Sequence, residues 1–371
     1  MMKQLLGALI EAETTAEKGE LVAAEIISAE LSRHGVDCQI DRWDGTRANV
    51  VARIGSTQQK SAILFVCHLD VVGPGEGDWK HPPFSAVDRN GRIYGRGSAD
   101  MKGGVAATVT AICQIIDSGT KLQGDLVFLA AAGEETDSCG ARRFVSNCGQ
   151  IPRLAGVVIP EPTDFDIVTA HRGMLWLTIT TKGKAAHSST PELGVNAIAS
   201  MKSVLDELEK YEIPFEPHEL LGGCSMSINT ISGGKAPNVV PDQCRIGIDI
   251  RTLPTQSTAD VTADFERMLA ELKRRSAKFD AEVSFVRRVE ALETDNDCDF
   301  VKDFCSTVGV RQTKAVGFTT DGPQFVPLGA PILIFGPGKG HLCHKPDEYI
   351  DIADVERAVE HYKNVILRFL T

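Results

Sequence analysis

Short apolar runs alternate with amphipathic stretches along the first 172 residues. Residues 18–34 carry apolar side chains at helical spacing, whereas 48–53 and 61–67 are apolar runs typical of buried strands. The patterns that follow predict a helix at 103–116, a strand at 125–131, a helix near 140–145 and a strand at 155–160. Strands that alternate with helices in this way predict a sheet covered by helices on both faces.

The order of the predicted elements changes near residue 172. The patterns then predict a strand at 175–182, a helix at 194–210, strands at 224–232 and 243–251, a helix at 257–275 and a strand at 282–286. This βαββαβ order is that of a two-layer unit able to fold by itself. From residue 299 the first pattern returns, with a helix to 306, a loop around 319–324, a strand at 331–335 and a helix at 353–369.

We therefore predict an α/β protein with a discontinuous first domain. A three-layer α/β/α domain would comprise residues 1–173 plus 288–371, and a two-layer α+β domain of ferredoxin-like order would be inserted at 174–287. The length of 371 residues supports two domains, because a single compact core usually serves about 100–200 residues.

Composition and charge exclude several classes of protein. The chain is 43% hydrophobic and 24% charged, which argues against a disordered or fibrous protein. No apolar run approaches the roughly 18–20 uncharged residues of a membrane span, and Glu11 and Glu13 interrupt any leader-like block, so we expect a cytoplasmic protein. The net charge of −11 argues against a nucleic-acid partner. The ten cysteines form no CxxC pair and are expected to be reduced thiols.

Histidines and acidic residues follow the predicted strands of the first domain. They are His68 and Asp70, Glu134 and Glu135, Glu161, and His341 and His344, and a glycine-rich stretch ends in Asp100 just before a helix. The carboxyl ends of strands are where open α/β sheets bind their ligands.

Taken singly, each of these residues has an ordinary explanation. A histidine after a strand is more often a surface residue than a ligand, Asp100 could be the N-cap of the following helix, and Glu134-Glu135 could be a solvated loop. Together, however, so many carboxylates would repel one another unless cations neutralised them. Imidazole and carboxylate without thiolate favour zinc, cobalt or manganese in an open hydrolytic site. Two histidines and three carboxylates suffice for two ions that share one bridging carboxylate.

Two acidic positions are expected to support such ions without binding them. Asp70 is placed to accept the second imidazole N–H of His68. Of Glu134 and Glu135, one can bind metal while the other serves as general base, and their spacing does not decide which.

Other motifs argue against nucleotide binding and against a serine nucleophile, and two further candidate residues lie in the inserted domain. Residues 73–77 and 336–340 read GxGxG rather than a nucleotide-binding motif, and there is no GxSxG nucleophile elbow. In the inserted domain, His187 and Arg251 lie in or next to polar loops that need have no function. If they are functional, His187 would stabilise an oxyanion and Arg251 would pair with a substrate carboxylate.

The order of motifs along nearly the whole chain resembles the dinuclear zinc amidohydrolases. That family includes acetylornithine deacetylase, succinyl-diaminopimelate desuccinylase, aminoacylase and the glutamate-releasing carboxypeptidases. The motifs that carry the resemblance are His68-Leu69-Asp70-Val71-Val72, Trp79 with Pro83-Phe84, Tyr94 to Gly104, Gly133-Glu134-Glu135, Glu161-Pro162-Thr163, and Gly336-Pro337-Gly338 leading to His344-Lys345-Pro346-Asp347-Glu348-Tyr349.

The resemblance implies a role for each residue of the site. His68 and Glu161 would hold one Zn²⁺, Glu135 and His344 the other, Asp100 would bridge them through a loop with a cis peptide after it, and Glu134 would be the general base. His187 would act across a homodimer formed by the inserted domains, and Asn238, Arg251, Thr320 and Gly338 are predicted to bind substrate. His341 is a competing ligand three residues before His344, which we prefer because it carries the Pro-Asp-Glu-Tyr context, and Cys343 replaces a common alanine.

The resemblance also narrows the expected reaction. Glu161, where other members have aspartate, is more similar to the deacylases and carboxypeptidases. The closing His-Lys-Pro-Asp-Glu-Tyr resembles acetylornithine deacetylases, whereas Thr319-Thr320-Asp321-Gly322 is closer to the desuccinylases. We expect hydrolysis of the amide bond of an N-acyl amino acid by a metal-bridged water that Glu134 activates, with two Zn²⁺, or Co²⁺ or Mn²⁺, per chain. A carboxypeptidase or dipeptidase is the alternative, and the complete ligand set argues against a catalytically silent protein.

Overall fold

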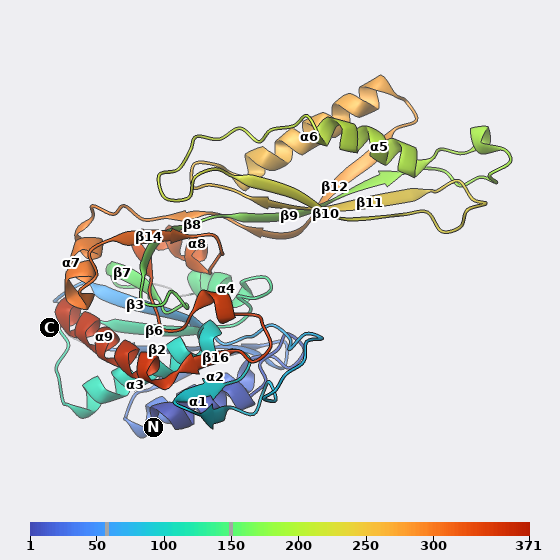
Figure 1. Cartoon of the computed structure of the whole chain (residues 1–371). Helices are drawn as coiled ribbons and strands as arrows, with labels where there is room; N and C mark the ends of the chain where they lie inside the picture. The colour runs from blue at the N-terminus through green and yellow to red at the C-terminus, as the bar shows by residue number, and fades with distance from the viewer. Residues whose placement is uncertain (56–58, 148–150) are drawn as a thin grey trace. The chain divides into compact units, whose positions relative to one another are not determined.

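The chain folds into two compact units. The computed structural model describes residues 1–55, 59–147 and 151–371 (Figure 1). The first unit comprises Met1–Thr169, Thr294–Lys314 and Thr320–Thr371, and the second comprises Ala170–Glu293 with Ala315–Thr319. The predicted insertion at 174–287 lies within the second unit, which begins earlier, ends later and includes a short segment from further along the chain.

A mixed sheet forms the centre of the first unit. Its strands are, in order across the sheet, β1 (Cys38–Trp43), β2 (Arg47–Ile54), β6 (Leu126–Ala131), β3 (Ala62–His68), β7 (Leu154–Ile159), β15 (Ile332–Ile334) and β8 (Ile167–His171). The four central strands β6, β3, β7 and β15 are parallel. Their carboxyl ends therefore meet at one edge of the sheet, which is the edge where the predicted site residues follow the strands.

Helices bury both faces of this sheet, as the sequence pattern predicts. Every residue of β3 and β6 is buried, which is typical of parallel strands covered on both sides. Alternate residues of β3, Ile63, Phe65 and Cys67, belong to a core that also contains residues of five helices. Those helices are α1 (Met2–Glu11), α2 (Leu21–Arg33), α3 (Gly103–Asp117), α7 (Asp299–Val308) and α9 (Ile352–Leu370). Leu64 and Val66 point to the opposite face by the alternation of the strand.

Two further helices and a small sheet complete the first unit. The helix α4 (Cys139–Asn147) contacts β2 and β6, and its Phe144 ring lies 6.3 Å from Phe325 of α8 (Gly322–Phe325). A three-stranded sheet of β4 (Val87–Arg89), β5 (Arg92–Tyr94) and β16 (Tyr349–Asp351) joins segments far apart in the sequence. The three-layer α/β/α prediction is confirmed.

The second unit is a four-stranded antiparallel sheet with two helices. The strand order is β10 (Ser225–Gly233), β11 (Gln243–Arg251), β9 (Met174–Lys182) and β12 (Asp280–Val289), and the helices are α5 (Ala197–Leu208) and α6 (Thr258–Arg275). Both helices begin at residues that suit a helix start: the Asn196 side chain accepts the Ala199 N–H, and Ser257 accepts those of Ala259 and Asp260. The predicted βαββαβ order is confirmed.

Several elements were not expected from the sequence pattern, among them the strands β4, β5, β8 and β16. The helix α1 and the strand β1 were not predicted, and the loop expected at 319–324 contains α8. Short strands β13 (Leu292–Glu293) and β14 (Thr313–Val316) pair with β8, where the chain passes between the two units. Among the described residues, no helix has the length and apolarity to cross a membrane, and the nine described cysteines are free thiols.

Asp100 is not the N-cap of α3, which was its ordinary explanation. The helix begins at Gly103, its N-cap is Lys102, and no side chain caps it. Asp100 lies in the preceding irregular turn, Ser98–Lys102, with an extended backbone. The peptide bond between Asp100 and Met101 is cis, as the resemblance implies.

Candidate metal centre

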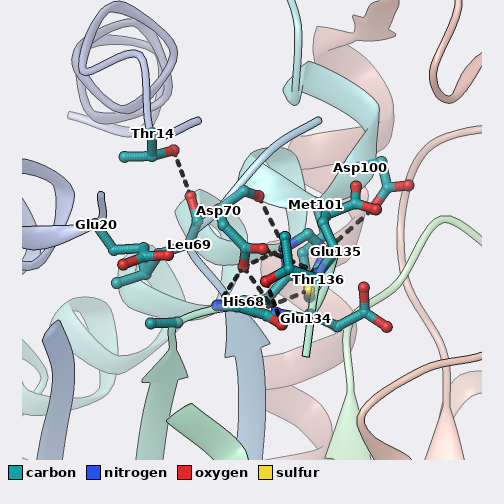
Figure 2. Close-up of polar contacts among 12 residues, drawn as sticks. Thr14, Glu20, His68, Leu69, Asp70, Asp100, Met101, Glu134, Glu135 and Thr136 are labelled. Carbon is teal, nitrogen blue, oxygen red and sulfur yellow. Dashed lines mark hydrogen bonds and ion pairs between the residues drawn. The ribbon is translucent and has the colours of Figure 1, made fainter. Parts of the chain in front are cut away.

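The side chain of Asp100 lies between two histidines that come from distant parts of the first unit. Its Oδ1 is 3.1 Å from Nε2 of His68, at the end of β3, and its Oδ2 is 3.3 Å from Nε2 of His344, in the loop before β16. Figure 2 shows His68, Asp100 and Glu135 in the same cluster of polar side chains. Each oxygen of this carboxylate therefore faces a different imidazole.

Each imidazole also faces a glutamate of its own. Nε2 of His68 is 3.6 Å from Oε1 of Glu161, which follows β7, and Nε2 of His344 is 2.9 Å from Oε1 of Glu135, which follows β6. Ligand atoms of His68, Asp100 and Glu135 all lie within 4.8 Å of one another. The five predicted ligands thus gather into two groups that share Asp100.

Asp70 holds the loop that carries the two adjacent glutamates. Its Oδ1 accepts hydrogen bonds from the N–H groups of Gly133 (2.9 Å) and Glu134 (3.1 Å), and its Oδ2 accepts one from Glu135 (2.9 Å) (Figure 2). Nδ1 of His68 lies 3.0 Å from the main-chain oxygen of Asp70 and 3.6 Å from its Oδ1. The nearest acceptor for the imidazole is therefore the main chain of Asp70, while its carboxylate positions residues 133–135.

The electrostatics of the cluster show an excess of negative charge. Burial, reinforced by Asp321, Glu135 and Glu161 and only partly offset by His68, raises the pKa of Glu134 well above its usual value. Burial also raises the pKa of Glu161, to about 7, with Asp100 adding to the effect. Two imidazoles do not compensate four carboxylates in such a small volume.

The pKa values of His344 and Asp100, at the centre of the cluster, shift in opposite directions. Hydrogen bonds with Asp100 and Glu135 raise the pKa of His344 to about 10. Burial would raise the pKa of Asp100, but hydrogen bonds from His344 and His68 outweigh it and lower that pKa. Both imidazoles thus face carboxylates that a cation would neutralise, and the imidazole and carboxylate donors are those of an open dinuclear site. The residues present therefore fit two divalent ions.

His344, not His341, faces the carboxylates. Among the described residues, no acid of the cluster contacts the exposed His341 side chain, which belongs to a short turn, Gly340–Leu342. Cys343, between them, donates to the main-chain oxygen of Lys339 at 3.8 Å. Burial raises the pKa of its thiol, so Cys343 is a poor competitor as a thiolate ligand.

The other two predicted residues of the first unit, Gly338 and Thr320, lie in different loops. Gly338 has a φ of +93°, and a Cβ there would lie 3.1 Å from the main-chain oxygen of Ala99, so a side chain would press on the loop that holds Asp100. Thr320 is buried, and its Oγ1 accepts a hydrogen bond from the N–H of Gly322 at 3.0 Å.

Three predicted residues belong to the second unit. Nδ1 of His187 accepts a hydrogen bond from the main-chain N–H of Ser189 (3.2 Å), and the main-chain oxygen of Asn238 accepts one from Ser188 (3.1 Å). His187 and Asn238 thus lie on two adjoining loops. Arg251 forms a two-bond ion pair with Asp249 on the same strand, at 2.9 and 3.1 Å.

Two buried charges beside the cluster were not predicted as site residues. Arg96 and Glu348 are 2% and 1% exposed and form an ion pair with each other. In the sequence, Arg96 lies inside a glycine-rich stretch and Glu348 inside the His-Lys-Pro-Asp-Glu-Tyr motif. Both stretches were used only as evidence for the family resemblance, so the two charges were not singled out.

The chain is similar to known proteins along most of its length. The chain is 29% identical to a protein of Staphylococcus epidermidis named "Probable succinyl-diaminopimelate desuccinylase", over 99% of this chain and 97% of the relative. It is 32% identical to an acetylornithine deacetylase of Proteus mirabilis, over 91% of this chain and 87% of the relative. The M20 family metallo-carboxypeptidase Sso-CP2 of Sulfolobus solfataricus has the same fold, with a TM-score of 0.82 at 19% identity, covering 99% of this chain and 98% of that one.

The match to a family profile extends over most of the chain. Residues 64–368 match the profile of peptidase family M20/M25/M40, and this range contains His68, Asp100, Glu134, Glu161 and His344. The resemblance found in the sequence is thereby confirmed. The chain belongs to peptidase family M20/M25/M40.

Proposed function

We propose that this member of a hydrolase family is a metal-dependent amidohydrolase that cleaves the amide bond of N-acyl amino acids. The observation that carries the proposal is the position of Asp100, whose two oxygens face His68 and His344 at 3.1 and 3.3 Å. A carboxylate with one oxygen towards each of two imidazole–carboxylate pairs suits a bridge between two ions.

Five residues would hold the two ions. His68 and Glu161 would bind one, Glu135 and His344 the other, and Asp100 both. Zinc is our first choice, with cobalt or manganese as alternatives, because the donors are imidazole and carboxylate without thiolate. When bound, such ions polarise a carbonyl group and lower the pKa of water towards about 7.

Glu134 is the residue we assign as general base. It is buried, at 7% exposed, and its main-chain N–H donates to Asp70, whereas the side chain of the adjacent Glu135 faces His344 at 2.9 Å. As water attacks the carbonyl carbon, Glu134 takes the proton from the water. It then gives that proton to the amide nitrogen, the C–N bond breaks, and a carboxylate and an amine leave.

His187 is the residue we assign as oxyanion donor. Nδ1 of His187 accepts the Ser189 N–H and lies 2.7 Å from the Ser189 hydroxyl, which favours the tautomer with the ring proton on Nε2. That tautomer is the one able to donate outward to an oxyanion. We propose that this donation occurs in the partner subunit of a homodimer.

The second unit has an edge that suits such a homodimer. The strand β10 is an edge strand with most of its residues exposed, and its Ile228 and Ile231 are 41% and 63% exposed. Long exposed edges favour pairing with another strand. We therefore propose that β10 contributes to the dimer, and we expect light scattering to give a dimer mass in solution; a monomer mass at micromolar concentration would contradict this.

The names of the relatives suggest the class of substrate. A deacetylase and a desuccinylase both release an amino acid from its N-acyl form, so we propose an N-acyl amino acid as substrate, with N-acetylornithine first and N-succinyl-diaminopimelate second. Arg251 would bind the substrate carboxylate bidentately in place of Asp249, with Asn238, Thr320 and Gly338 as further contacts.

The proposal is tested against its alternative by paired substrates. The metal-loaded chain is given an N-acetyl amino acid and, separately, a dipeptide of the same amino acid with a free N-terminus, and amine release is measured. We expect cleavage of the N-acetyl compound. Cleavage of the unblocked dipeptide alone would instead identify a dipeptidase or carboxypeptidase.

His344→Ala is expected to abolish binding of the second ion, whereas His341→Ala is not. Loss of an imidazole ligand should lower the affinity for that ion by more than about 100-fold, because loss of a partner outside the ligand sphere already lowers metal affinity by about 10–100-fold. His341, three residues away and exposed, is the matched control. Isothermal titration with zinc measures the affinity of each variant. An equal loss of zinc affinity in the two variants would refute the assignment of His344.

His187→Ala is expected to lower kcat by about 10²–10³-fold, the usual cost of one oxyanion donor, with little change in KM. The physical reason is that the oxyanion exists only after water has attacked. Steady-state kinetics separate the two parameters. A raised KM with an unchanged kcat would make His187 a residue that binds substrate only.

A further inference from the structure

Glu348 lies between the two loops that carry Asp100 and His344. We propose that the Glu348–Arg96 ion pair is a positioning device for the second metal ion: it sets the bridging carboxylate of Asp100 and the loop of His344 at the correct separation. This inference rests on the proposed function, because it names how that site is held, and it assigns neither residue to the ions or to the substrate.

The Glu348 carboxylate binds the main chain of the Asp100 loop directly. Its Oε1 accepts hydrogen bonds from the N–H groups of Ala99 (3.0 Å) and Asp100 (3.2 Å). The main-chain oxygen of Glu348 accepts a third, from Gly95, at 2.9 Å. Three hydrogen bonds from residues 95–100 therefore end on one residue, which limits how far the Asp100 side chain can move.

Arg96 extends the connection to the loop of His344. Its Nη1 donates to Oε2 of Glu348 at 2.5 Å and to the main-chain oxygen of Lys345, next to His344, at 3.4 Å. The guanidinium also lies 5.2 Å from the centre of the Trp79 ring. Both charges are almost fully buried, so removal of either one would leave the other without a compensating charge in the interior.

The loop of His344 needs such external contacts. His344 has a φ of +63° and Asp347 one of +55°, a left-handed backbone that residues with a side chain seldom adopt. Further along the loop, Oδ1 of Asp347 accepts the N–H groups of Lys80 and His81, each at 3.0 Å. Contacts at Lys345 and Asp347 therefore hold a conformation that the segment alone does not favour.

The binding of the two proposed ions should depend unequally on the Glu348–Arg96 ion pair. His68 stands at the end of β3, and Glu161 follows β7 in the middle of the buried sheet, so their positions come from strands that Glu348 does not touch. His344 and Asp100 lie in loops that it does touch. Loss of Glu348 should therefore weaken the ion held by His344 and Glu135 more than the ion held by His68 and Glu161.

The test counts ions on the holoenzyme rather than turnover. Native chain, Glu348→Ala, Glu348→Gln and Asp125→Ala are titrated with zinc in a chelator buffer, and bound zinc per chain is measured, with circular dichroism to confirm folding. Asp125 is the matched control: it is 2% exposed and paired with Arg53 at 2.6 Å, but it precedes β6, at the opposite end of the strand from Glu134 and Glu135.

We expect Glu348→Ala to lower the affinity for the ion held by Glu135 and His344 by about 10–100-fold, and the affinity for the ion held by His68 and Glu161 by much less. Glu348→Gln should recover only part of that loss, because its amide oxygen can still accept both N–H groups but its NH₂ group replaces the oxygen that pairs with Arg96. If Glu348→Ala does not fold, Glu348→Asp replaces it: one methylene shorter, it cannot keep both the N–H contacts and the ion pair, so the same unequal loss is expected.

Two results would overturn the inference. One is a folded Glu348→Ala, or Glu348→Asp in its place, that binds both ions as tightly as the native chain. The other is an equal weakening in Asp125→Ala, which would show a general effect of losing a buried charge. Failure of the native chain to bind two ions would contradict the proposed function instead, so the two failures are distinguishable.

Discussion

Glu134→Ala is expected to bind two metal ions with native affinity and to lose about 10²–10⁴-fold in kcat, the usual contribution of a general base. The reason is the division of work between adjacent glutamates. Oε1 of Glu135 is 2.9 Å from His344, within one of the two imidazole–carboxylate pairs, whereas Glu134 is buried and its pKa is raised by burial and by neighbouring acids. Steady-state kinetics and metal analysis of the same preparation measure both quantities.

The companion variant Glu135→Ala makes this prediction specific. We expect it to lose affinity for the second ion, and activity with it, although it removes the same number of atoms from the next residue. If Glu134→Ala lost an ion and Glu135→Ala kept both, the two roles would be exchanged. Full activity in Glu134→Ala would refute the general-base assignment altogether.

Asp100→Ala is expected to weaken both ions, and this is the largest loss of affinity we predict. Without its carboxylate, each ion keeps one histidine and one glutamate, and the carboxylates of Glu135 and Glu161 lose the bridge between them. Each ion should bind more than about 100-fold less tightly, because loss of partners outside the ligand sphere alone costs about 10–100-fold. Zinc titration measures the two affinities.

An exposed aspartate from the same unit provides the control for Asp100→Ala. Asp88 pairs with Lys3 at 3.3 Å on the surface, with its side chain 54% exposed, and Asp88→Ala should bind two ions like the native chain. Weakening of only one ion in Asp100→Ala would contradict a bridging role and make Asp100 a ligand of that ion alone.

Features with a local pattern could be predicted from the sequence. The strand before His68 is a continuous apolar run, and in the structure it is buried throughout and ends at His68. The βαββαβ order of the second unit was visible because each of its helices and strands has its own periodicity. The strand β12 was predicted short because most of its residues, including polar ones, are exposed at an edge.

Features that depend on contacts between distant segments could not be predicted. That the Asp70 carboxylate accepts three main-chain N–H groups of residues 133–135 follows from the pairing of β3 with β6, which no spacing in the sequence reveals. The contact of Glu348 with Ala99 joins residues 249 positions apart. Sequence spacing also left Glu134 and Glu135 equivalent, whereas the position of His344 separates them.

The most direct measurement follows two amides at once. The zinc-loaded chain and a chelated sample each receive an equimolar mixture of N-acetylornithine and N-succinyl-diaminopimelate, and NMR records which amide signal disappears. We predict that one of the two is hydrolysed, and only in the presence of metal. Persistence of both amides while the chain binds two ions would contradict hydrolysis of these N-acyl amino acids.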